Sequence, residues 1–304
     1  MIRFPTKYIV LEGPDLSGKT TFYNSIHKAS NYRWNIHDRS SMSMIIHADQ
    51  YDRDPSIHVN NFRSELMNLN NRYIIMLPPF EDIVTRYSIR GDEIQSLDNI
   101  KNLYKNFKAF SQKIINFPNV FVLNSSDLDF NTALVNHQID AIETGDLTLI
   151  SNFVKTFVSN TKHLEATPLS FTLWDDGTFD NVIDESIMDY EPEREYYQKI
   201  YTQMIKKIRN EMKGKNVYNR EESVTSRRFI YTNDSCISLV QASYRENILD
   251  MHFVLRSSEV KTTFPYDLKF LYFLTSRVYK ELQLIPKKID VRMRFSLNSA
   301  HILV

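Results

Sequence analysis

The feature that most constrains the fold is a glycine-rich turn between an apolar run and an amphipathic segment. Residues 8–11 form the apolar run, Glu12 follows, and the turn then has the spacing G-x-x-x-x-G-K-T. This spacing is typical of a P-loop, in which a strand leads into a turn whose backbone N–H groups bind phosphate at the start of a helix. It predicts a polyphosphate-binding site made of Gly13, Pro14, Asp15, Leu16, Ser17, Gly18, Lys19, Thr20 and Thr21.

The residue types in this turn indicate a nucleoside triphosphate and a metal ion. Gly13 and Gly18 allow the backbone to bend so that successive N–H groups point into one hollow. Lys19 can reach the β- and γ-phosphates, and the Thr20 hydroxyl can bind Mg²⁺. The chain has only 6 Gly in 304 residues, and two of them fall in this motif. We therefore expect ATP and Mg²⁺ as cofactors.

Helical and strand patterns alternate after the turn. The expected helices cover residues 22–30, 60–70, 81–89, 94–115 and 129–143, and the expected strands cover residues 32–37, 73–77 and 120–123. This alternation predicts an α/β fold with a P-loop parallel sheet and flanking helices. Such sheets bind ligands at the carboxyl ends of their strands. Asp38 and Arg39 follow a predicted strand, so we expect them at the same edge as the turn.

Composition excludes several other classes of protein. The chain carries 37 basic and 37 acidic residues, so its net charge gives no bulk attraction to nucleic acid or membrane. No apolar run approaches the roughly 20 residues that span a bilayer, so no membrane partner is expected. Cys236 is the single cysteine, which excludes an internal disulfide framework. Together with the absence of a signal-peptide pattern, this predicts a cytoplasmic location, in a host cell if the protein is phage-encoded.

The stretch from Glu12 to Thr21 resembles the P-loop of thymidylate kinases, and Asp38-Arg39 resembles the Asp-Arg pair of that family. The resemblance implies that Asp15 contacts the acceptor nucleotide. It also implies that Asp38 lies near Mg²⁺ and that Arg39 binds the acceptor or the transferred phosphate. The implied activity is phosphate transfer from ATP to a pyrimidine deoxynucleotide, with 5-hydroxymethylated pyrimidines among the candidate acceptors.

Residues 78–93 resemble the lid of phage members of this group. The resemblance implies that Arg86 and Arg90 hold the transferring phosphoryl group. Phosphoryl transfer depends on positioning and on positive charge, which two arginines supply. The alternative is that both arginines belong to a solvated helix face.

The acceptor stays open between two classes. The segment between the helix after the turn and Asp38 is shorter than in thymidylate kinases. The acceptor pocket is then built differently or is more open, and 5-hydroxymethyluracil within phage DNA becomes an alternative to a free nucleotide. A third hypothesis is a nonenzymatic nucleotide-binding dimer.

A change of character after residue 145 predicts three regions. These are a kinase domain over 1–145, a linker region over 146–190 and a second domain over 191–304. The elements expected beyond residue 145 are helices over 147–158 and 193–212 and a strand over 170–174.

Residues 225–304 are similar to the thymidylate synthase and deoxycytidylate hydroxymethylase family, whose fold is α+β. The segments that carry this similarity are Thr225–Ile230, Cys236, Leu255–Val260, Phe264–Asp267 and Asn298–Ile302. The interval from Cys236 to Arg256 matches the family's interval between its nucleophilic cysteine and a phosphate-binding arginine.

The similarity implies a role for each matching residue. The Cys236 thiolate would add to C6 of a pyrimidine, with methylenetetrahydrofolate as the one-carbon donor if the module is active. Arg256 and Ser257 would hold the 5′-phosphate of the nucleotide. Arg227 and Arg228 would reach the phosphate of a neighbouring subunit, which implies a homodimer.

Asp267 and His301 complete the nucleotide site that the similarity implies. Asp267 stands where cytosine-specific hydroxymethylases carry aspartate, so a cytosine base is implied. Two hypotheses stay open for this module: an active one-carbon transferase, or a platform for dimerisation or nucleotide binding. Cys236 as a small buried apolar residue, and His301 as an ordinary core or surface histidine, are the plain alternatives.

Overall fold

The computed structural model describes residues 1–91, 94–179, 185–212, 229–245, 247–282 and 289–303. The chain divides into two compact units. The N-terminal unit comprises Thr6–Glu143, and the C-terminal unit comprises Met1–Pro5 together with Thr144–Val304.

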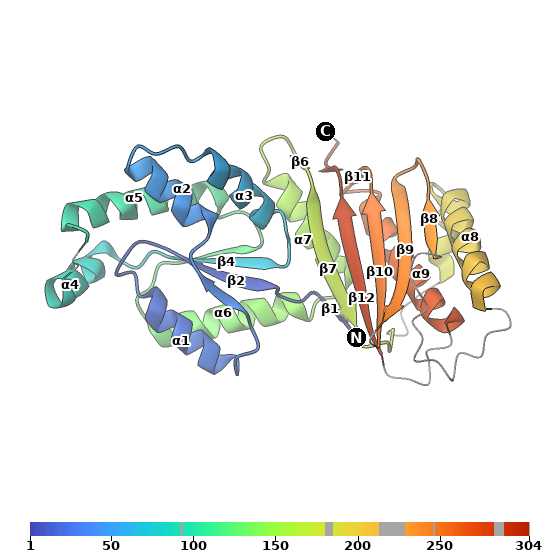
Figure 1. Cartoon of the computed structure of the whole chain (residues 1–304), viewed down its shortest axis with the longest axis horizontal. Helices are drawn as coiled ribbons and strands as arrows, with labels where there is room; N and C mark the ends of the chain where they lie inside the picture. The colour runs from blue at the N-terminus through green and yellow to red at the C-terminus, as the bar shows by residue number, and fades with distance from the viewer. Residues whose placement is uncertain (92–93, 180–184, 213–228, 246, 283–288, 304) are drawn as a thin grey trace. The chain divides into compact units, whose positions relative to one another are not determined.

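Within the described residues, the sheet of the N-terminal unit has four parallel strands in the order β3-β2-β4-β5 (Figure 1). These strands are β2 (Tyr8–Glu12), β3 (Ile36–Asp38), β4 (Asn71–Met76) and β5 (Val120–Leu123). Every residue of β4 is buried, as expected for a central strand that is covered on both faces. Leu11 pairs with Asp38 and with Ile74, and Met76 pairs with Leu123. The carboxyl ends of the strands therefore lie along one edge.

Helices cover both faces of this sheet, with α1 and α6 on one side and α2, α3 and α5 on the other (Figure 1). The helices of the unit are α1 (Lys19–Ala29), α2 (Ser41–Gln50), α3 (Ser56–Leu66), α4 (Phe80–Arg90), α5 (Leu97–Ile114) and α6 (Leu128–Glu143). The α1 and α6 side is sealed by a core of Ile9, Leu11, Phe22, Ile26, Trp34, Ile36, Ile74, Met76, Leu123, Val135 and Ile139. The predicted α/β class, a parallel sheet with flanking helices, is confirmed.

The segment after α1 differs most from the predicted pattern. The strand expected over 32–37 is β3, which begins only at Ile36, and α2 was not expected at all. Ser40 caps α2 by accepting a hydrogen bond from the Met42 amide at 3.1 Å. The buried residues Met42, Ile45 and Ile46 follow the i, i+3, i+4 spacing of one helix face, but the exposed Met44 between them weakens that periodicity, and the sequence pattern did not reveal the helix.

The C-terminal unit is built on a mixed sheet, for which the structure gives six strands in the order β1-β7-β12-β10-β9-β8. Its strands are β1 (Ile2–Arg3), β7 (Leu169–Asp175), β8 (Ile230–Thr232), β9 (Ile237–Arg245), β10 (Ile248–Leu255) and β12 (Asp290–Leu297). The pair β10 and β12 is parallel, and the other neighbours in the sheet are antiparallel. Alternate residues of β7, β10 and β12 are buried, which is the pattern of a sheet packed on one face.

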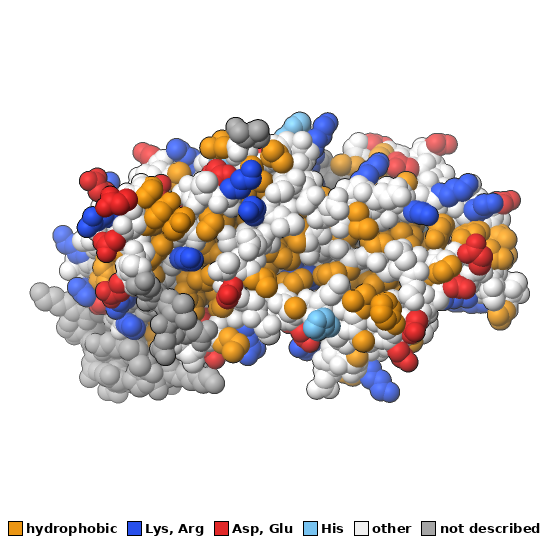
Figure 2. All heavy atoms as spheres, turned by 180° about the vertical axis from the view of Figure 1, so that it is seen from behind, with side chains coloured by type: hydrophobic (Ala, Val, Ile, Leu, Met, Phe, Trp, Pro, Cys, Tyr) orange, Lys and Arg blue, Asp and Glu red, His pale blue; other side chains and the backbone are white. Residues whose placement is uncertain are grey.

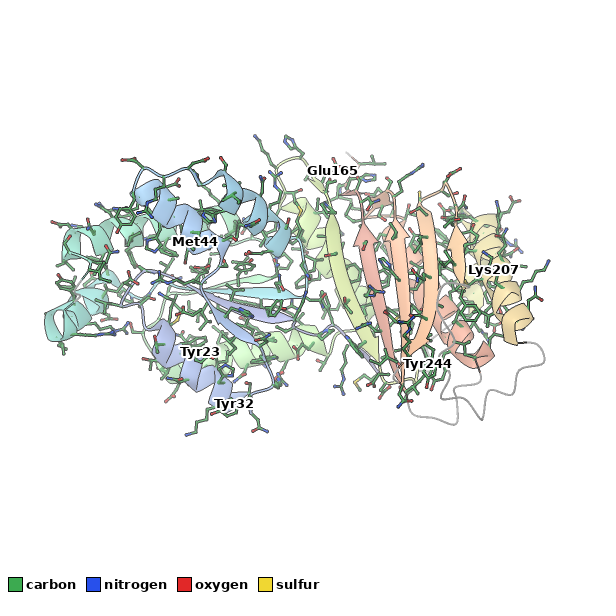
Figure 3. The ribbon with its side chains drawn as sticks, in the orientation of Figure 1. Tyr23, Tyr32, Met44, Glu165, Lys207 and Tyr244 are labelled. Carbon is green, nitrogen blue, oxygen red and sulfur yellow. The ribbon has the colours of Figure 1, made fainter. Side chains whose placement is uncertain are left out.

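Helices and short strands complete this unit. They are α7 (Leu147–Ser159), β6 (Glu165–Ala166), the 3₁₀ helix η1 (Glu185–Asp189), α8 (Arg194–Met212), β11 (Ser258–Glu259), α9 (Phe264–Glu281) and β13 (Ala300–His301). Figure 3 labels two side chains that join neighbouring elements. Lys207 of α8 donates to the Ile230 carbonyl of β8, and the Tyr244 hydroxyl donates to Asn247 Oδ1 in the β9–β10 turn at 3.1 Å.

Residues 146–190, which were predicted as a linker, differ from that prediction because they contribute α7, β6, β7 and η1 to the C-terminal unit. β7 lies inside the sheet, between β1 and β12. The physical reason is apolar burial: α7 buries Ile150, Val154 and Phe157, which a solvated linker would expose. Residues 1–5 also differ from the predicted division, since β1 pairs with β7.

Charged side chains of both signs are interspersed over the face drawn in Figure 2, in keeping with 37 basic and 37 acidic residues in the chain. None of the helices described is long and apolar enough to cross a membrane.

Candidate active site

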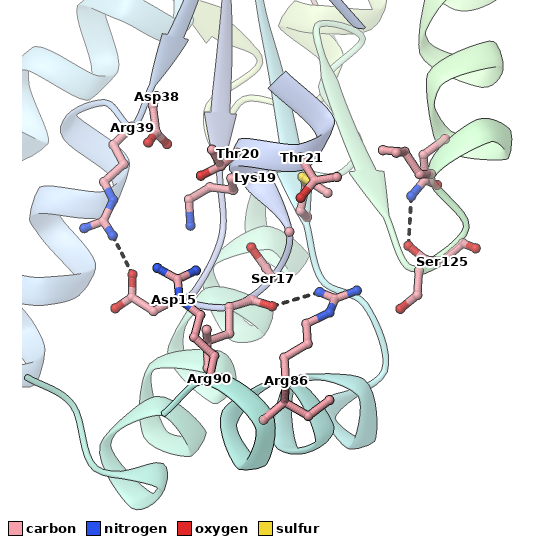
Figure 4. A pocket seen from close by; sticks show the side chains of 17 residues that line it. Asp15, Ser17, Lys19, Thr20, Thr21, Asp38, Arg39, Arg86, Arg90 and Ser125 are labelled. Carbon is pink, nitrogen blue, oxygen red and sulfur yellow. Dashed lines mark hydrogen bonds and ion pairs between the residues drawn. The ribbon is translucent and has the colours of Figure 1, made fainter. Parts of the chain in front are cut away.

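A cavity of about 460 Å³ lies at the carboxyl edge of the N-terminal sheet (Figure 4). Its walls come from the P-loop, from the ends of β3 and β4, from α4, and from the turn between β5 and α6. The lining residues are Asp15, Leu16, Ser17, Gly18, Lys19, Thr20, Thr21, Asp38, Arg39, Met76, Arg86, Ile89, Arg90, Ser125, Ser126, Leu128 and Asn131. The site residues predicted from the three kinase-like segments, which are the P-loop, Asp38-Arg39 and the lid, therefore meet in one place, apart from Gly13 and Pro14, which lie in the turn beside it.

The P-loop bends sharply because its two glycines adopt conformations that other residues avoid. Gly13 has a φ of 140° and Gly18 a φ of 97°. A Cβ at position 13 would lie 2.5 Å from the Met76 carbonyl oxygen, so the turn packs on the end of β4 at a distance that only glycine allows. Helix α1 begins directly after Gly18. Its first N–H groups therefore face the cavity, as an anion site requires.

The Lys19 side chain lies beneath this turn. Its ammonium group donates to the carbonyl oxygens of Gly13 at 2.7 Å and of Pro14 at 2.9 Å. Burial lowers the pKa of Lys19 to about 8, and the positive charge of Arg39 acts in the same direction, against Asp15 and Asp38. Backbone carbonyls thus hold the Lys19 ammonium group. A bound phosphate would compete with these carbonyls for the ammonium group and bind it more strongly, because phosphate is negatively charged.

Asp15 and Arg39 face each other across the mouth of the P-loop. Arg39 Nη2 donates to Asp15 Oδ1 at 2.6 Å, and both residues are partly exposed (Figure 4). Arg39 has a φ of 73°, a strained value for a residue with a side chain. Its amide is held by the Leu11 carbonyl at 2.9 Å. This backbone conformation directs the Arg39 guanidinium group toward the P-loop. Asp38, the last residue of β3, lies next to Arg39.

Glu12 is a residue that sequence reasoning left without a role. It is fully buried at the end of β2. Its Oε1 accepts from the Ser40 amide at 2.8 Å and from the Ser40 hydroxyl at 2.5 Å, and its Oε2 accepts from the Ser43 hydroxyl. Burial raises the pKa of Glu12, while the serine hydrogen bonds and Lys19 oppose that shift. The carboxyl group ties the start of α2 to the P-loop. In the sequence, the signal that could have pointed to Glu12 was a charged residue at the end of a predicted apolar strand.

Helix α4 places two arginines against the P-loop. Arg86 Nη1 donates to the Leu16 carbonyl at 2.8 Å and lies 3.2 Å from where a Cβ on Gly18 would be. Arg90 lines the same cavity. The predicted lid also included Asp92 and Glu93, which lie outside the described residues.

The turn between β5 and α6 forms a wall of the cavity that the sequence did not reveal. Ser125, Ser126 and Asn131 all line it. Asn131 is buried, and its amide nitrogen donates to the Ser125 carbonyl at 2.8 Å. The only available signal was the position of the turn after a strand, at the edge where such sheets bind ligands.

Two predicted magnesium ligands, Thr20 and Asp38, line the same cavity. The part of the chain that the structure describes contains no group of three or more His, Cys, Asp or Glu side chains that could hold a metal. Mg²⁺ in phosphoryl-transfer sites is bound by one or two protein oxygens, substrate phosphates and water. A hydroxyl and a carboxylate beside a P-loop therefore fit Mg²⁺ bound together with a triphosphate.

In the C-terminal unit, the antiparallel pair β9 and β10 brings Cys236 and Arg256 together. Leu255 pairs with Ile237, and the Arg256 amide donates to the Cys236 carbonyl at 2.7 Å. Ser257 follows Arg256 in the same turn, and His301 lies in β13, which pairs with β11. The predicted Arg227 and Arg228 lie outside the described residues.

Cys236 is exposed, so the alternative of a small buried apolar residue is wrong, and the groups around the thiol oppose its ionisation. Desolvation raises the pKa of this thiol, and the negative charges of Asp267 and Glu193 raise it further, while Arg256 opposes them. The thiol therefore favours its protonated form.

Asp267 lies in the first turn of α9 and is almost completely buried. Its Oδ1 accepts from the Tyr197 hydroxyl at 2.8 Å, and its Oδ2 has no hydrogen-bond partner among the residues that the structure describes. Burial raises the pKa of Asp267 to about 7, against the effect of the Tyr197 hydrogen bond. The carboxyl group predicted to contact a base is thus bonded to a tyrosine of α8.

Two solved structures show remote similarity to parts of the chain. No family model matches the chain, and no curated protein matches its sequence. A deoxyadenosine kinase from M. mycoides, solved with dCMP and dCDP bound, aligns with a TM-score of 0.33 and 16% identity, over 44% of this chain and 100% of that one. Thymidylate synthase from T4 phage aligns with a TM-score of 0.25 and 20% identity, over 34% of this chain and 35% of that one.

The free energy of unfolding should fall as the pH rises from about 4 to about 7, because folded Asp267 holds its proton up to about pH 7, whereas its ordinary pKa is 3.8. The loss should be on the order of 2–4 kcal/mol. Asp267→Asn should remove this part of the pH dependence, since an amide oxygen still accepts from Tyr197. Urea unfolding across this range measures it, with Asp290→Asn at an exposed position as the control. An unchanged profile in Asp267→Asn contradicts the expectation.

The affinity for ATP should fall as the pH rises through about 8, because free Lys19 loses its proton there and phosphate binds the ammonium form. Above that pH, each further unit should weaken binding by up to about tenfold. Calorimetric titration with Mg·ATP at constant ionic strength measures the profile. Lys28→Met, at an exposed position of α1, should keep the profile, whereas Lys19→Met should bind weakly at every pH. A pH-independent affinity in the unmodified protein is the contrary result.

Proposed function

We propose that the N-terminal unit is a Mg·ATP-dependent kinase of the thymidylate kinase type that phosphorylates a pyrimidine deoxynucleotide. The observation that carries this proposal is the single cavity in which the P-loop and Lys19 meet Asp15 and Arg39 on one side and Arg86 on another. Phosphoryl transfer requires positioned cations around the phosphates and little covalent chemistry. The cavity supplies this arrangement.

Each group has a role that its position allows. Backbone N–H groups of the P-loop and the start of α1 bind the β- and γ-phosphates. Lys19 leaves the Gly13 and Pro14 carbonyls to contact those phosphates. Thr20 and Asp38 would hold Mg²⁺, which would supply positive charge to the phosphate oxygens. Arg86 and Arg90 stabilise the transferring phosphoryl group from α4. Arg39 and Asp15 orient the acceptor and its phosphate.

A second candidate is a kinase of 5-hydroxymethyluracil bases within phage DNA. It is favoured by the short connection between α1, which ends at Ala29, and β3, which begins at Ile36. Little chain is available there to enclose an acceptor. A free 5-hydroxymethylated monophosphate and the same base in duplex DNA are therefore the acceptors to compare.

Transfer of labelled phosphate from ATP should be strongest to a free pyrimidine monophosphate. The acceptors to compare are dTMP, its 5-hydroxymethylated analogues, and duplex DNA containing 5-hydroxymethyluracil. Lys19→Ala should lower transfer at least about 100-fold because it removes a cation facing the phosphates, while Lys28→Ala should not change it. Transfer to DNA alone would favour the second candidate. If Lys19→Ala and the unmodified protein had equal activity on every acceptor, the result would favour the third hypothesis, a nonenzymatic nucleotide-binding protein.

For the C-terminal unit, we propose a role in homodimer formation. Helices α7 and α9 lie behind its sheet (Figure 1). On the other face of the sheet, Trp174, Leu239 and Val254 are half-buried. On that face Arg292 forms two hydrogen bonds to Asp250, at 2.8 and 3.2 Å. Arg294 also donates to Asp250, at 3.0 Å, so this face carries apolar side chains among paired charges, and such a face can contact a second copy of itself.

The full chain should sediment as a dimer at micromolar concentration. Trp174→Glu should shift it to monomer without altering the melting temperature by more than a few degrees, because this face is not part of the packed core. A monomer in the unmodified protein would contradict the proposal. Tyr32→Glu, at an exposed position of the N-terminal unit, is the matched control.

A further inference from the structure

Glu12 is a buried ionisable residue to which the proposed reaction gives no role. It is fully buried and does not line the cavity, so it cannot touch a nucleotide there. Its carboxylate oxygens are bonded to the start of α2, through the Ser40 amide at 2.8 Å, the Ser40 hydroxyl at 2.5 Å and the Ser43 hydroxyl. A buried carboxylate is costly unless such bonds are made. Any effect of Glu12 on the reaction therefore passes through these serines.

Arg39, which directly precedes Ser40, has a backbone conformation that residues with a side chain seldom adopt. Its φ is 73°, in the left-handed region. Such a conformation persists where the surrounding contacts fix it. The N–H of Arg39 donates to the Leu11 carbonyl at 2.9 Å, and the next N–H along the chain, that of Ser40, donates to Glu12 Oε1 at 2.8 Å. Two consecutive residues of β2 therefore hold the peptide groups on either side of Arg39.

The register of the sheet explains why a side chain makes the second of these bonds. The ladder between β2 and β3 ends at the pair Leu11 and Asp38. Beyond this pair β2 leads into the P-loop and β3 leads into α2, so the N–H of Ser40 is bonded to the Glu12 side chain and not to a further carbonyl of the strand. Glu12 thus extends the link between the two strands by one residue, at the point where the P-loop begins.

The position of the Arg39 guanidinium group follows from this backbone conformation. Its Nη2 donates to Asp15 Oδ1 in the P-loop at 2.6 Å (Figure 4). Its Nη1 lies 3.5 Å from His47 Nε2, on the helix that Glu12 anchors. The Arg39 side chain is 42% exposed and lines the cavity, so a ligand can reach it. A guanidinium group that is already held in place loses less conformational freedom when a phosphate binds it.

We infer that Glu12 is a positioning residue for the acceptor: through Ser40 it fixes the left-handed conformation of Arg39, and it thereby aims the guanidinium group at the phosphate of the acceptor nucleotide. The inference rests on the proposed kinase function, in which Arg39 and Asp15 orient the acceptor. It adds a residue that does not touch the substrate. Loss of Glu12 should weaken the use of the acceptor and leave the binding of Mg·ATP, which depends on the P-loop amides and Lys19, nearly unchanged.

The test measures steady-state phosphate transfer by the full chain to the pyrimidine monophosphate that the unmodified protein phosphorylates fastest. Glu12→Met keeps the bulk of the side chain but cannot accept a hydrogen bond. It should lower kcat/KM for the monophosphate about 10-fold or more and change KM for Mg·ATP less than about twofold. Glu12→Gln should recover most of this loss, because its amide oxygen still accepts from Ser40.

Glu65→Met is the matched control. Glu65 also bonds the start of α2, since its Oε1 accepts from the Ser41 hydroxyl at 2.7 Å, and its Oε2 accepts from the Tyr73 hydroxyl at 3.2 Å. These bonds do not involve the peptide groups beside Arg39. Glu65→Met should therefore keep kcat/KM for the monophosphate within about twofold of the unmodified protein. Thermal melts establish which variants fold.

A second pair of variants decides the question if Glu12→Met does not fold. Ser40→Ala removes the hydroxyl bond to Glu12, and Ser41→Ala removes the corresponding bond to Glu65. Ser40→Ala should lower kcat/KM for the monophosphate about 3-fold, the effect of one ordinary hydrogen bond, whereas Ser41→Ala should not change it. Equal values for the two serine variants overturn the inference.

A double-mutant cycle tests whether Glu12 acts through Arg39. Arg39→Ala alone should lower kcat/KM for the monophosphate, and Glu12→Met should lower it no further in that background. A further 10-fold loss in the double variant overturns the inference, and so does an unchanged kcat/KM in folded Glu12→Met; in both cases the proposed kinase function stands. If the unmodified protein phosphorylates none of the monophosphates, the inference and the proposed function fail together.

Discussion

The contact between the P-loop and the end of β4 is the constraint on which the rest of the site depends. Gly13 lies so close to the Met76 carbonyl that any side chain would collide with it. This approach places the turn directly over the carboxyl edge of the sheet, between β3 and β5. The residues that follow each neighbouring strand then face the same cavity without needing long loops.

The cations of the cavity are held by acceptors of the chain itself. Lys19 is bonded to the Gly13 and Pro14 carbonyls, Arg86 to the Leu16 carbonyl and Arg39 to Asp15. A polyphosphate that enters has to exchange these contacts for stronger, charge-assisted ones. The arrangement keeps partly buried positive charges compensated before a ligand arrives, and it keeps them near the positions where a ligand's charge would lie.

Local patterns predicted part of this structure, and long-range contacts account for what they missed. The P-loop, Asp38-Arg39 and the alternating elements carry their signal within a few residues. Glu12 had no predicted role because its serine partners belong to a helix with weak periodicity. Asn131 was missed because its place in the cavity wall is a property of packing. The linker prediction failed at β7, because the alternating burial of this strand depends on strands that come much later in the chain. The roles predicted for Cys236 and Asp267 came from the family resemblance and not from the groups that surround them in the fold.

The division of the chain into units has a consequence for any attempt to cut it apart. The polypeptide runs from β1 into the N-terminal unit and returns through α7, so the N-terminal unit is an insertion with two covalent attachments. Phe4, at the first attachment, is buried with its ring edge-on to Phe153 and Phe171. If the chain were cut near residue 145, Phe4 would stay with the N-terminal fragment. The C-terminal fragment would then have a cavity in its hydrophobic core beside Phe153 and Phe171. The autonomous piece is better sought between residues 6 and 143, leaving Phe4 with the sheet that it seals.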